Sequence, residues 1–142
     1  MKKLTFKSPD ETKSFARDYA SQIPNGKVLA LIGNLGAGKT TFSQGFALGI
    51  GLDDSIISPT FKLVSEYHGE RMLNHIDCYR LDSSRDFLNI GGENFLNCQD
   101  GVTIIEWADI IKDIWLDDWI IIYFDRDESD EHTRHITITQ NA

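Results

Sequence analysis

The segment from position 33 to position 40 places glycines, a lysine and a threonine at a spacing that suits phosphate chemistry. It matches the pattern G-x-x-x-x-G-K-[ST], in which glycines let backbone amides turn toward phosphate oxygens. The lysine adds a charge for the β and γ phosphates, and the threonine hydroxyl is a magnesium ligand. The candidate nucleotide-contacting residues are Gly33, Asn34, Leu35, Gly36, Ala37, Gly38, Lys39 and Thr40. Thr41 joins this set, although an ordinary helix position also explains it.

Three predicted strands end in an acid that could hold the metal of such a site, namely Asp77, Glu106 and Asp125. In an open α/β sheet, ligands bind beyond the carboxyl ends of the strands, where an acid complements the phosphate loop. The sequence pattern does not choose among the three acids. Each one, taken singly, is also explained as a cap of the next element.

The elements that must position these residues follow from hydrophobic periodicity and from turn signals. Strands are predicted at 4–7, 27–32, 61–67, 72–77, 102–106, 120–125 and 135–139, and helices at 8–23, 39–50, 83–96 and 108–114. Strands and helices alternate first, and consecutive strands follow late in the chain. This order predicts one domain over 1–142 with a three-layer α/β fold, and the phosphate-loop motif assigns that fold to the P-loop NTPase class. Its sheet is expected to be mixed and mostly parallel, with antiparallel strands near the C-terminus.

Charge and composition limit the kinds of partner that this chain binds. It has 14 basic and 22 acidic residues, so its net charge is −8, which disfavours direct binding of nucleic acid. No signal sequence or long apolar span is visible, so a cytoplasmic location without membrane contact is expected. Cys78 and Cys98 fit neither a zinc pattern nor a disulfide framework, and reduced thiols are expected.

Other classes of nucleotide-binding protein fit less well. A regulatory GTPase would carry D-x-x-G and a late N-K-x-D, and neither stands where it should. A small-molecule P-loop kinase is the stronger alternative, but it needs an acceptor pocket and an arginine-rich lid. The arginines of this chain are scattered in the sequence. A nucleotide-dependent binding module, in which hydrolysis is not essential, is a second alternative.

Four motifs in order resemble the TsaE (YjeE) family, namely GNLGAGKTTF at 33–42, SPTF at 58–61, HIDCYRL at 75–81 and IEW at 105–107. The resemblance runs from about residue 8 to residue 107. Members are small bacterial P-loop ATPases required to make threonylcarbamoyladenosine (t6A) on tRNA. The resemblance implies ATP or ADP and Mg²⁺ as cofactors. It also implies docking on a heterodimer of the threonylcarbamoyl transferase and its inactive sugar-kinase-like relative, with tRNA contacted only indirectly and self-association left open.

The resemblance also implies roles for residues outside the phosphate loop. Thr60, in the switch-like Ser58-Pro59-Thr60, would sense the γ phosphate or bind the metal, unless its hydroxyl only caps a strand. Asp77 would be the metal-side acid, directly or through water. Glu106 would position or activate the attacking water, and it is also a candidate metal ligand. Trp107 would stack near the nucleotide or pack against a partner, with a place in the local core as the alternative.

The residues around Asp77 have simpler interpretations. His75 shares a strand face with Asp77, and a hydrogen-bonded support fits it better than a zinc site, for which two ligands are too few. Tyr79 is interpreted as a core residue. Arg80 is interpreted as the partner of a nearby acid rather than as a group that neutralises transition-state charge.

Two positions differ from the usual pattern of the family, and one segment is rich in acidic residues. Many members of the family have Asp where Asn34 stands and an aliphatic residue where Cys78 stands. The loss of a charge at Asn34 could change nucleotide affinity without loss of function. The acidic stretch 125–131 is interpreted as the solvated tip of a hairpin, because a run of charges is usually surface.

Overall fold

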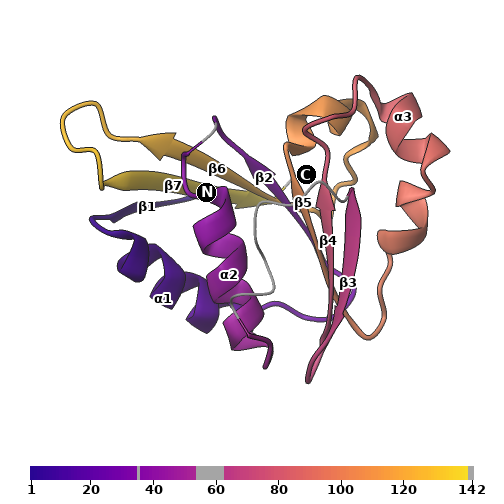
Figure 1. The fold of residues 1–142 in the computed structure, drawn as a ribbon, viewed down its shortest axis with the longest axis horizontal. Helices are drawn as coiled ribbons and strands as arrows, with labels where there is room; N and C mark the ends of the chain where they lie inside the picture. Colours follow the sequence, from indigo (N-terminus) through magenta and orange to yellow (C-terminus); the bar gives the residue numbers. More distant parts are fainter. Residues whose placement is uncertain (35, 54–62, 141–142) are drawn as a thin grey trace.

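A mixed β-sheet forms the centre of the molecule in a computed structural model, which describes residues 1–34, 36–53 and 63–140 (Figure 1). In these residues seven strands follow the order β1-β7-β6-β2-β5-β4-β3. Their bounds are β1 Lys2–Phe6, β2 Val28–Ile32, β3 Val64–His68, β4 Met72–Asp77, β5 Gly101–Glu106, β6 Ile120–Arg126 and β7 Arg134–Gln140. The central neighbours β6, β2, β5 and β4 are parallel, whereas β1, β7 and β3 join in antiparallel pairs. The carboxyl ends of the central strands therefore meet at one edge.

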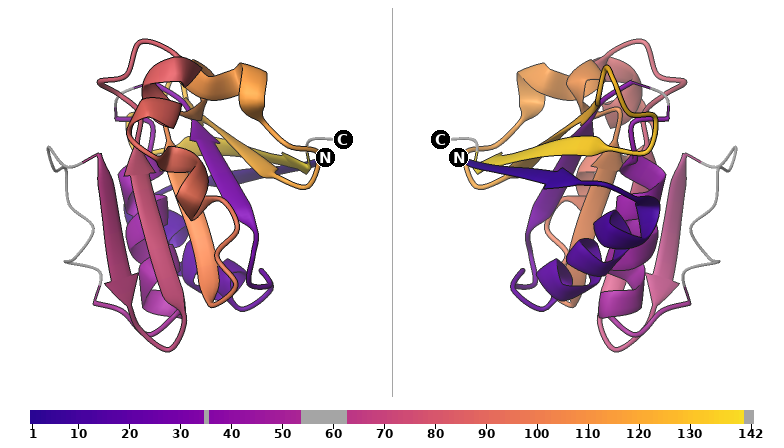
Figure 2. Two further views of the ribbon diagram at one scale, coloured as in Figure 1. Left: turned by 90° about the vertical axis from the view of Figure 1, so that its right-hand side faces the viewer. Right: turned by 90° about the vertical axis from the view of Figure 1, so that its left-hand side faces the viewer.

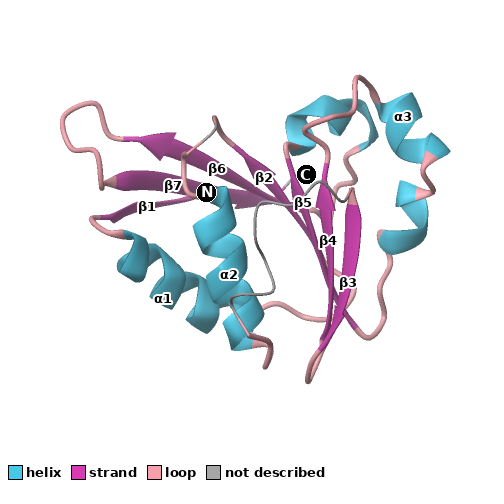
Figure 3. Ribbon diagram, viewed as in Figure 1, coloured by secondary structure: helices cyan, strands magenta, loops and turns pink. Residues whose placement is uncertain are grey.

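Helices cover both faces of this sheet and make three layers (Figures 1 and 2). The helices α1 (Pro9–Ala20) and α2 (Lys39–Gly49) lie side by side on one face. The other face carries α3 (Ser84–Asn89) and the short 3-10 helices η2 (Gly92–Phe95) and η3 (Ala108–Ile114) (Figure 3). The three-layer α/β fold with a mixed sheet is confirmed.

Strand β2 shows why the sheet is covered on both faces. Successive side chains of a strand point to opposite faces. Leu29 and Leu31 pack into the cluster beneath α1 and α2, whereas Val28 and Ala30 pack into the cluster beneath α3 and η3. All four side chains are buried, so the continuous apolar run is that of a central parallel strand.

Two expected features differ in detail. Helix α1 ends at Ala20 rather than near residue 23, because the guanidinium of Arg71 donates to the carbonyl oxygens of Ala20 and Ile23. This arginine comes from the β3–β4 turn and satisfies the carbonyls that a helix end leaves open. Antiparallel pairing also involves more strands than expected, since β1 and β3 pair in this way as well as the C-terminal strands. Residues 61–62 of the expected strand at 61–67 lie outside the described residues.

Two further expectations concern contact with a membrane and the state of the cysteine thiols. In the described part of the chain, no helix is both long enough and apolar enough to cross a bilayer. Both cysteines are free thiols. Burial raises the pKa of Cys78 to about 12, so this thiol stays protonated and inert near neutral pH.

Candidate nucleotide-binding site

The glycine-rich loop joins the carboxyl end of β2 to the start of α2, which begins at Lys39. Gly33 has no room for a side chain, because a Cβ would lie 2.7 Å from the carbonyl oxygen of Phe124 on β6. Gly38 precedes the helix at φ 109°, a left-handed conformation that favours glycine. Two glycines of the motif are thus required by packing and by backbone conformation. Leu35 lies outside the described residues.

Lys39 is folded back into the loop that it follows. Its Nζ donates to the carbonyl oxygens of Gly33 and Asn34, the second at 3.2 Å, and lies 3.9 Å from the ring centroid of Trp107. Burial lowers the pKa of Lys39, and the charges of Glu106, Asp109 and Asp77 partly oppose this. Three acids are therefore close enough for their charges to act on the ammonium of Lys39. The carbonyl contacts that hold this ammonium are ones that a phosphate can replace.

Two of the three strand-end acids meet beside this lysine. Asp77 and Glu106 are register partners at the carboxyl ends of the parallel strands β4 and β5. Burial raises the pKa of Asp77, and the charge of Glu106 raises it further, while a hydrogen bond from the Tyr79 amide acts in the opposite direction. The third acid, Asp125, is exposed and lines a separate hollow on the β6–β7 hairpin. The structure thus separates acids that the sequence could not distinguish.

Glu106 has a partner of its own. His75 Nε2 lies 2.5 Å from Glu106 Oε2, and both side chains are almost completely buried. The expected hydrogen-bonding role of His75 is therefore confirmed. Within the described residues, no group of three or more His, Cys, Asp and Glu side chains is arranged to hold a metal, so nothing there favours the zinc alternative.

Trp107 follows Glu106 in an unusual conformation. Its φ is 57° and its ψ is 39°, in the left-handed region that bulky side chains rarely adopt. Its ring centroid lies 4.9 Å from that of Tyr79. The interpretation of Tyr79 as a core residue is wrong, because 58% of it is exposed. Tyr79 follows the end of β4, and its ring and that of Trp107 both line the same pocket.

These groups line a pocket of about 370 Å³, which is large enough for a small-molecule ligand. The loop and the first turn of α2 contribute the lining residues from Gly36 to Thr41. The acids and aromatic residues described above line the pocket together with Leu63 and Arg80. A second group of lining residues, here called the second wall, consists of Pro9 and Thr12 from α1 and of His132 and Arg134 from the β6–β7 hairpin. Thr60 and its neighbours 58–59 lie outside the described residues.

The sequence did not indicate this second wall. The hairpin tip was interpreted as surface, and its charged residues are indeed largely exposed. The base of the same hairpin nevertheless reaches the loop, because Arg126 and Arg134 are register partners of β6 and β7. Atoms of both side chains lie near loop glycines, Arg126 beside Gly36 and Arg134 beside Gly38. Only the pairing of distant strands brings them there.

The donor set suits Mg²⁺. Hard cations prefer oxygen ligands, and Mg²⁺ usually keeps several waters and takes only one or two carboxylates together with substrate phosphates. Thr40, Asp77 and Glu106 offer oxygen ligands around one pocket. Burial raises the pKa of Asp77, and the negative charge of Glu106 adds a smaller repulsion in the same direction. A bound cation would relieve that repulsion, so the residues present fit the ion.

The strand order, the loop after β2 and the helix that begins at its lysine define the fold as that of the P-loop NTPases. The family described as "Threonylcarbamoyl adenosine biosynthesis protein TsaE" matches residues 6–136, and the chain belongs to this family. The crystal structure of Bacillus subtilis YdiB has a TM-score of 0.78 and 34% identity, over 99% of this chain and 86% of that chain.

Curated relatives carry the same family name. The tRNA threonylcarbamoyladenosine biosynthesis protein TsaE of Bacillus subtilis (strain 168) is 39% identical over 142 residues, which cover 98% of this chain and 87% of that protein. The protein of the same name from Treponema pallidum (strain Nichols) is 41% identical over 103 residues, which cover 72% of this chain and 76% of that protein. The likeness extends over most of each relative, and not over the phosphate loop alone.

Proposed function

We propose that this protein is a Mg²⁺-dependent ATPase that acts as an accessory component in the synthesis of threonylcarbamoyladenosine on tRNA. The observation that carries the ATPase proposal is the pairing of Asp77 with Glu106 beside Lys39, at the mouth of the phosphate loop. The role in tRNA modification is supported by membership of the TsaE family and by the names of its relatives.

The residues of the pocket divide the chemistry among them. Loop amides bind the triphosphate, and Lys39 exchanges its carbonyl contacts for the β and γ phosphates. Thr40 and Asp77, with Glu106 as a further candidate ligand, would hold Mg²⁺, which would supply charge neutralisation at the phosphates when bound. Glu106, oriented by His75, accepts the proton of the attacking water.

The proposed purpose of hydrolysis is to change the conformation of a partner. The partner is the heterodimer of the threonylcarbamoyl transferase and its inactive sugar-kinase-like relative, which the ATPase resets between turnovers. A net charge of −8 agrees with a protein that reaches tRNA only through such partners. This reaction would take place in the cytoplasm.

The test is steady-state ATP hydrolysis with Mg²⁺, measured for the protein alone and then with both partner proteins added. We expect slow turnover alone and stimulation by the heterodimer. Lys39→Ala should abolish both the basal turnover and its stimulation, because it removes the positive charge that would contact the β and γ phosphates. Glu106→Gln should still bind ATP but hydrolyse it about 10²- to 10⁴-fold more slowly, the usual contribution of a general base.

Asp125→Asn is the matched control, since Asp125 is a strand-end acid that lines no part of the nucleotide pocket. It should keep the rate and the stimulation. If Glu106→Gln still supports t6A synthesis, hydrolysis is not required and the protein is a nucleotide-dependent binding module. Transfer of phosphate to a metabolite, in place of hydrolysis, would favour a small-molecule kinase.

A further inference from the structure

Two carboxylates reach the same part of the nucleotide pocket, but the proposed reaction needs them for different tasks. Asp77 and Glu106 are register partners at the carboxyl ends of β4 and β5, and both line the pocket. Mg²⁺ takes one or two carboxylates, whereas the attacking water needs a carboxylate that is free to accept a proton. A carboxylate oxygen that is bound to the ion is no longer available as a base. The site therefore needs a feature that assigns the two tasks.

The two acids differ in their hydrogen-bond partners. Glu106 Oε2 lies 2.5 Å from His75 Nε2, and the side chains of Glu106 and His75 are only 7% and 10% exposed. Asp77 Oδ1 accepts from the backbone amide of Tyr79 at 3.0 Å, and within the described residues Asp77 has no side-chain hydrogen bond. Glu106 is therefore held by a buried side chain, whereas Asp77 keeps Oδ2 for a ligand.

The register of the strands explains how His75 reaches Glu106. Side chains two residues apart on a strand share a face, so His75 and Asp77 point to the same side of β4. Asp77 pairs with Glu106 and His75 pairs with Ile104, which places Glu106 diagonally opposite the imidazole on the neighbouring strand. The side chain of glutamate is long enough to turn back toward this ring. The contact thus follows from the parallel pairing of β4 and β5.

We propose that His75 is a positioning residue that keeps the carboxylate of Glu106 out of the coordination shell of Mg²⁺. Asp77 and Thr40 are then left to hold the ion, and Glu106 keeps Oε1 for the attacking water. This role rests on the proposed ATPase function and assigns Glu106 one of its two candidate tasks there. A Glu106 side chain that turned to the ion would leave a buried imidazole without its partner, which is costly. Groups around a metal site commonly fix side-chain orientation in this way.

The experiment measures metal affinity and turnover separately in variants of His75. Mn²⁺ is the probe, because the electron paramagnetic resonance signal of free Mn²⁺ reports binding to the ADP complex without any hydrolysis. His75→Leu has a similar size but no hydrogen-bond donor, so Glu106 is free to join the ion. We expect about tenfold tighter Mn²⁺ binding and about 10- to 100-fold lower kcat, the range over which groups around a metal site change affinity or activity. The KM for ATP should change less than kcat.

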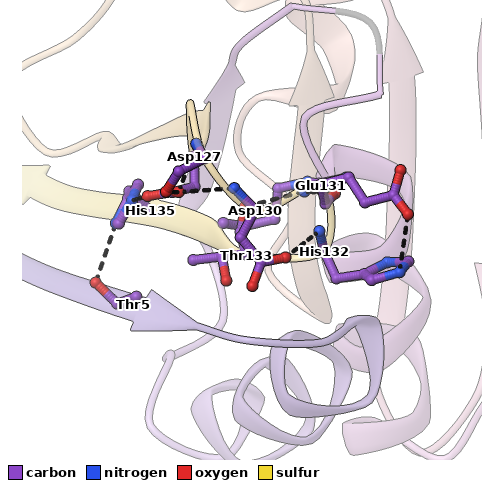
Figure 4. A network of polar contacts seen from close by, with 9 residues as sticks. Thr5, Asp127, Asp130, Glu131, His132, Thr133 and His135 are labelled. Carbon is purple, nitrogen blue, oxygen red and sulfur yellow. Dashed lines mark hydrogen bonds and ion pairs between the residues drawn. The ribbon is translucent and has the colours of Figure 1, made fainter.

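Three further variants identify the cause of these changes. His75→Gln places an amide donor near the position of Nε2, so it should restore most of both wild-type values. His75→Leu combined with Glu106→Gln should lose the extra affinity for Mn²⁺, because glutamine offers no charge to the ion. His135→Leu is the control, since His135 Nε2 also lies 2.7 Å from an acid, Asp127 Oδ1, but on the hairpin outside the nucleotide pocket (Figure 4). It should leave both values within about twofold of wild type.

Weaker Mn²⁺ binding by His75→Leu would overturn the proposal, because His75 would then support a metal-bound Glu106. Unchanged Mn²⁺ affinity, with or without a loss of kcat, would also overturn it, since Glu106 would have no tendency to reach the ion. Extra affinity that persists in the double variant would have the same consequence. Wild-type protein that neither binds ADP nor hydrolyses ATP would instead overturn the proposed function. Thermal unfolding identifies a His75→Leu protein that has failed to fold, and His75→Asn then replaces it, because its amide ends short of the position of Nε2.

Discussion

Asp77 carries its charge in surroundings that disfavour it. Burial and the neighbouring Glu106 raise its pKa, although the amide of Tyr79 bonds to Oδ1. Asp77→Asn keeps the shape and the amide contact but removes the charge. We expect the ligand-free variant to unfold at a higher temperature than wild type at pH 7. Active-site groups commonly reduce stability in this way.

The stabilisation expected from Asp77→Asn depends on pH, and its direction follows from the raised pKa of Asp77. A carboxyl whose pKa is raised on folding binds protons more readily in the folded state, so its contribution to stability falls as pH rises through the folded pKa. The advantage of Asp77→Asn should therefore be present at pH 7 and shrink toward pH 4, in thermal unfolding at both values. Asp125→Asn, at an exposed site, should show no such difference. If the stability advantage of Asp77→Asn instead grows toward pH 4, the pKa of Asp77 is not raised in the folded state.

Side chains at the ends of strands could be predicted from the sequence, whereas the second wall could not. Asp77 and Glu106 follow apolar runs, and the parallel order of β4 and β5 then places them together. Thr12 and Arg134 belong to the same pocket but are far apart in the sequence. Their meeting depends on α1 and the β6–β7 hairpin both reaching the phosphate loop, and no local pattern encodes that.

At the scale of elements, α1 and α2 pack closely enough to require glycine between them. A Cβ on Gly45 would clash with the carbonyl oxygen of Lys13, and one on Gly49 would clash with that of Arg17. Gly45→Ala should therefore destabilise the fold by about 1–3 kcal/mol, as overpacking does. This loss should appear although alanine favours a helix by about 1 kcal/mol over glycine.

Denaturant unfolding of Gly45→Ala measures this loss. Ser14→Ala, on the exposed side of α1, is the control and should stay within about 0.5 kcal/mol of wild type. A Gly45→Ala variant that is more stable than wild type would mean that helix propensity outweighs the contact. The start of α1 agrees with the helix predicted from residue 8, since Ser8 caps its first turn. Its end depends on Arg71 from a distant turn.

At the scale of the whole molecule, the pocket draws on segments from most of the chain. Its lining comes from 9–12, 36–41, 63, 77–80, 106–107 and 132–134, which only the folded sheet and its helices bring together. Unfolding any of these layers would therefore destroy the binding site. A ligand that binds only the folded state raises the free energy of unfolding by mass action.

Mg²⁺ and ATP should therefore stabilise the entire domain. At a free ATP concentration of 100 times Kd the gain is about 2.7 kcal/mol, which raises the midpoint on the order of 10 °C in a domain of this size. Lys39→Ala should lose most of this rise, because its ammonium neutralises the phosphates beside Asp77 and Glu106. ATP with EDTA should give a smaller rise, since the two carboxylates then face the phosphates without a cation. Equal rises with Mg²⁺ and with EDTA would show that these carboxylates do not hold the metal, and would move its site elsewhere in the pocket.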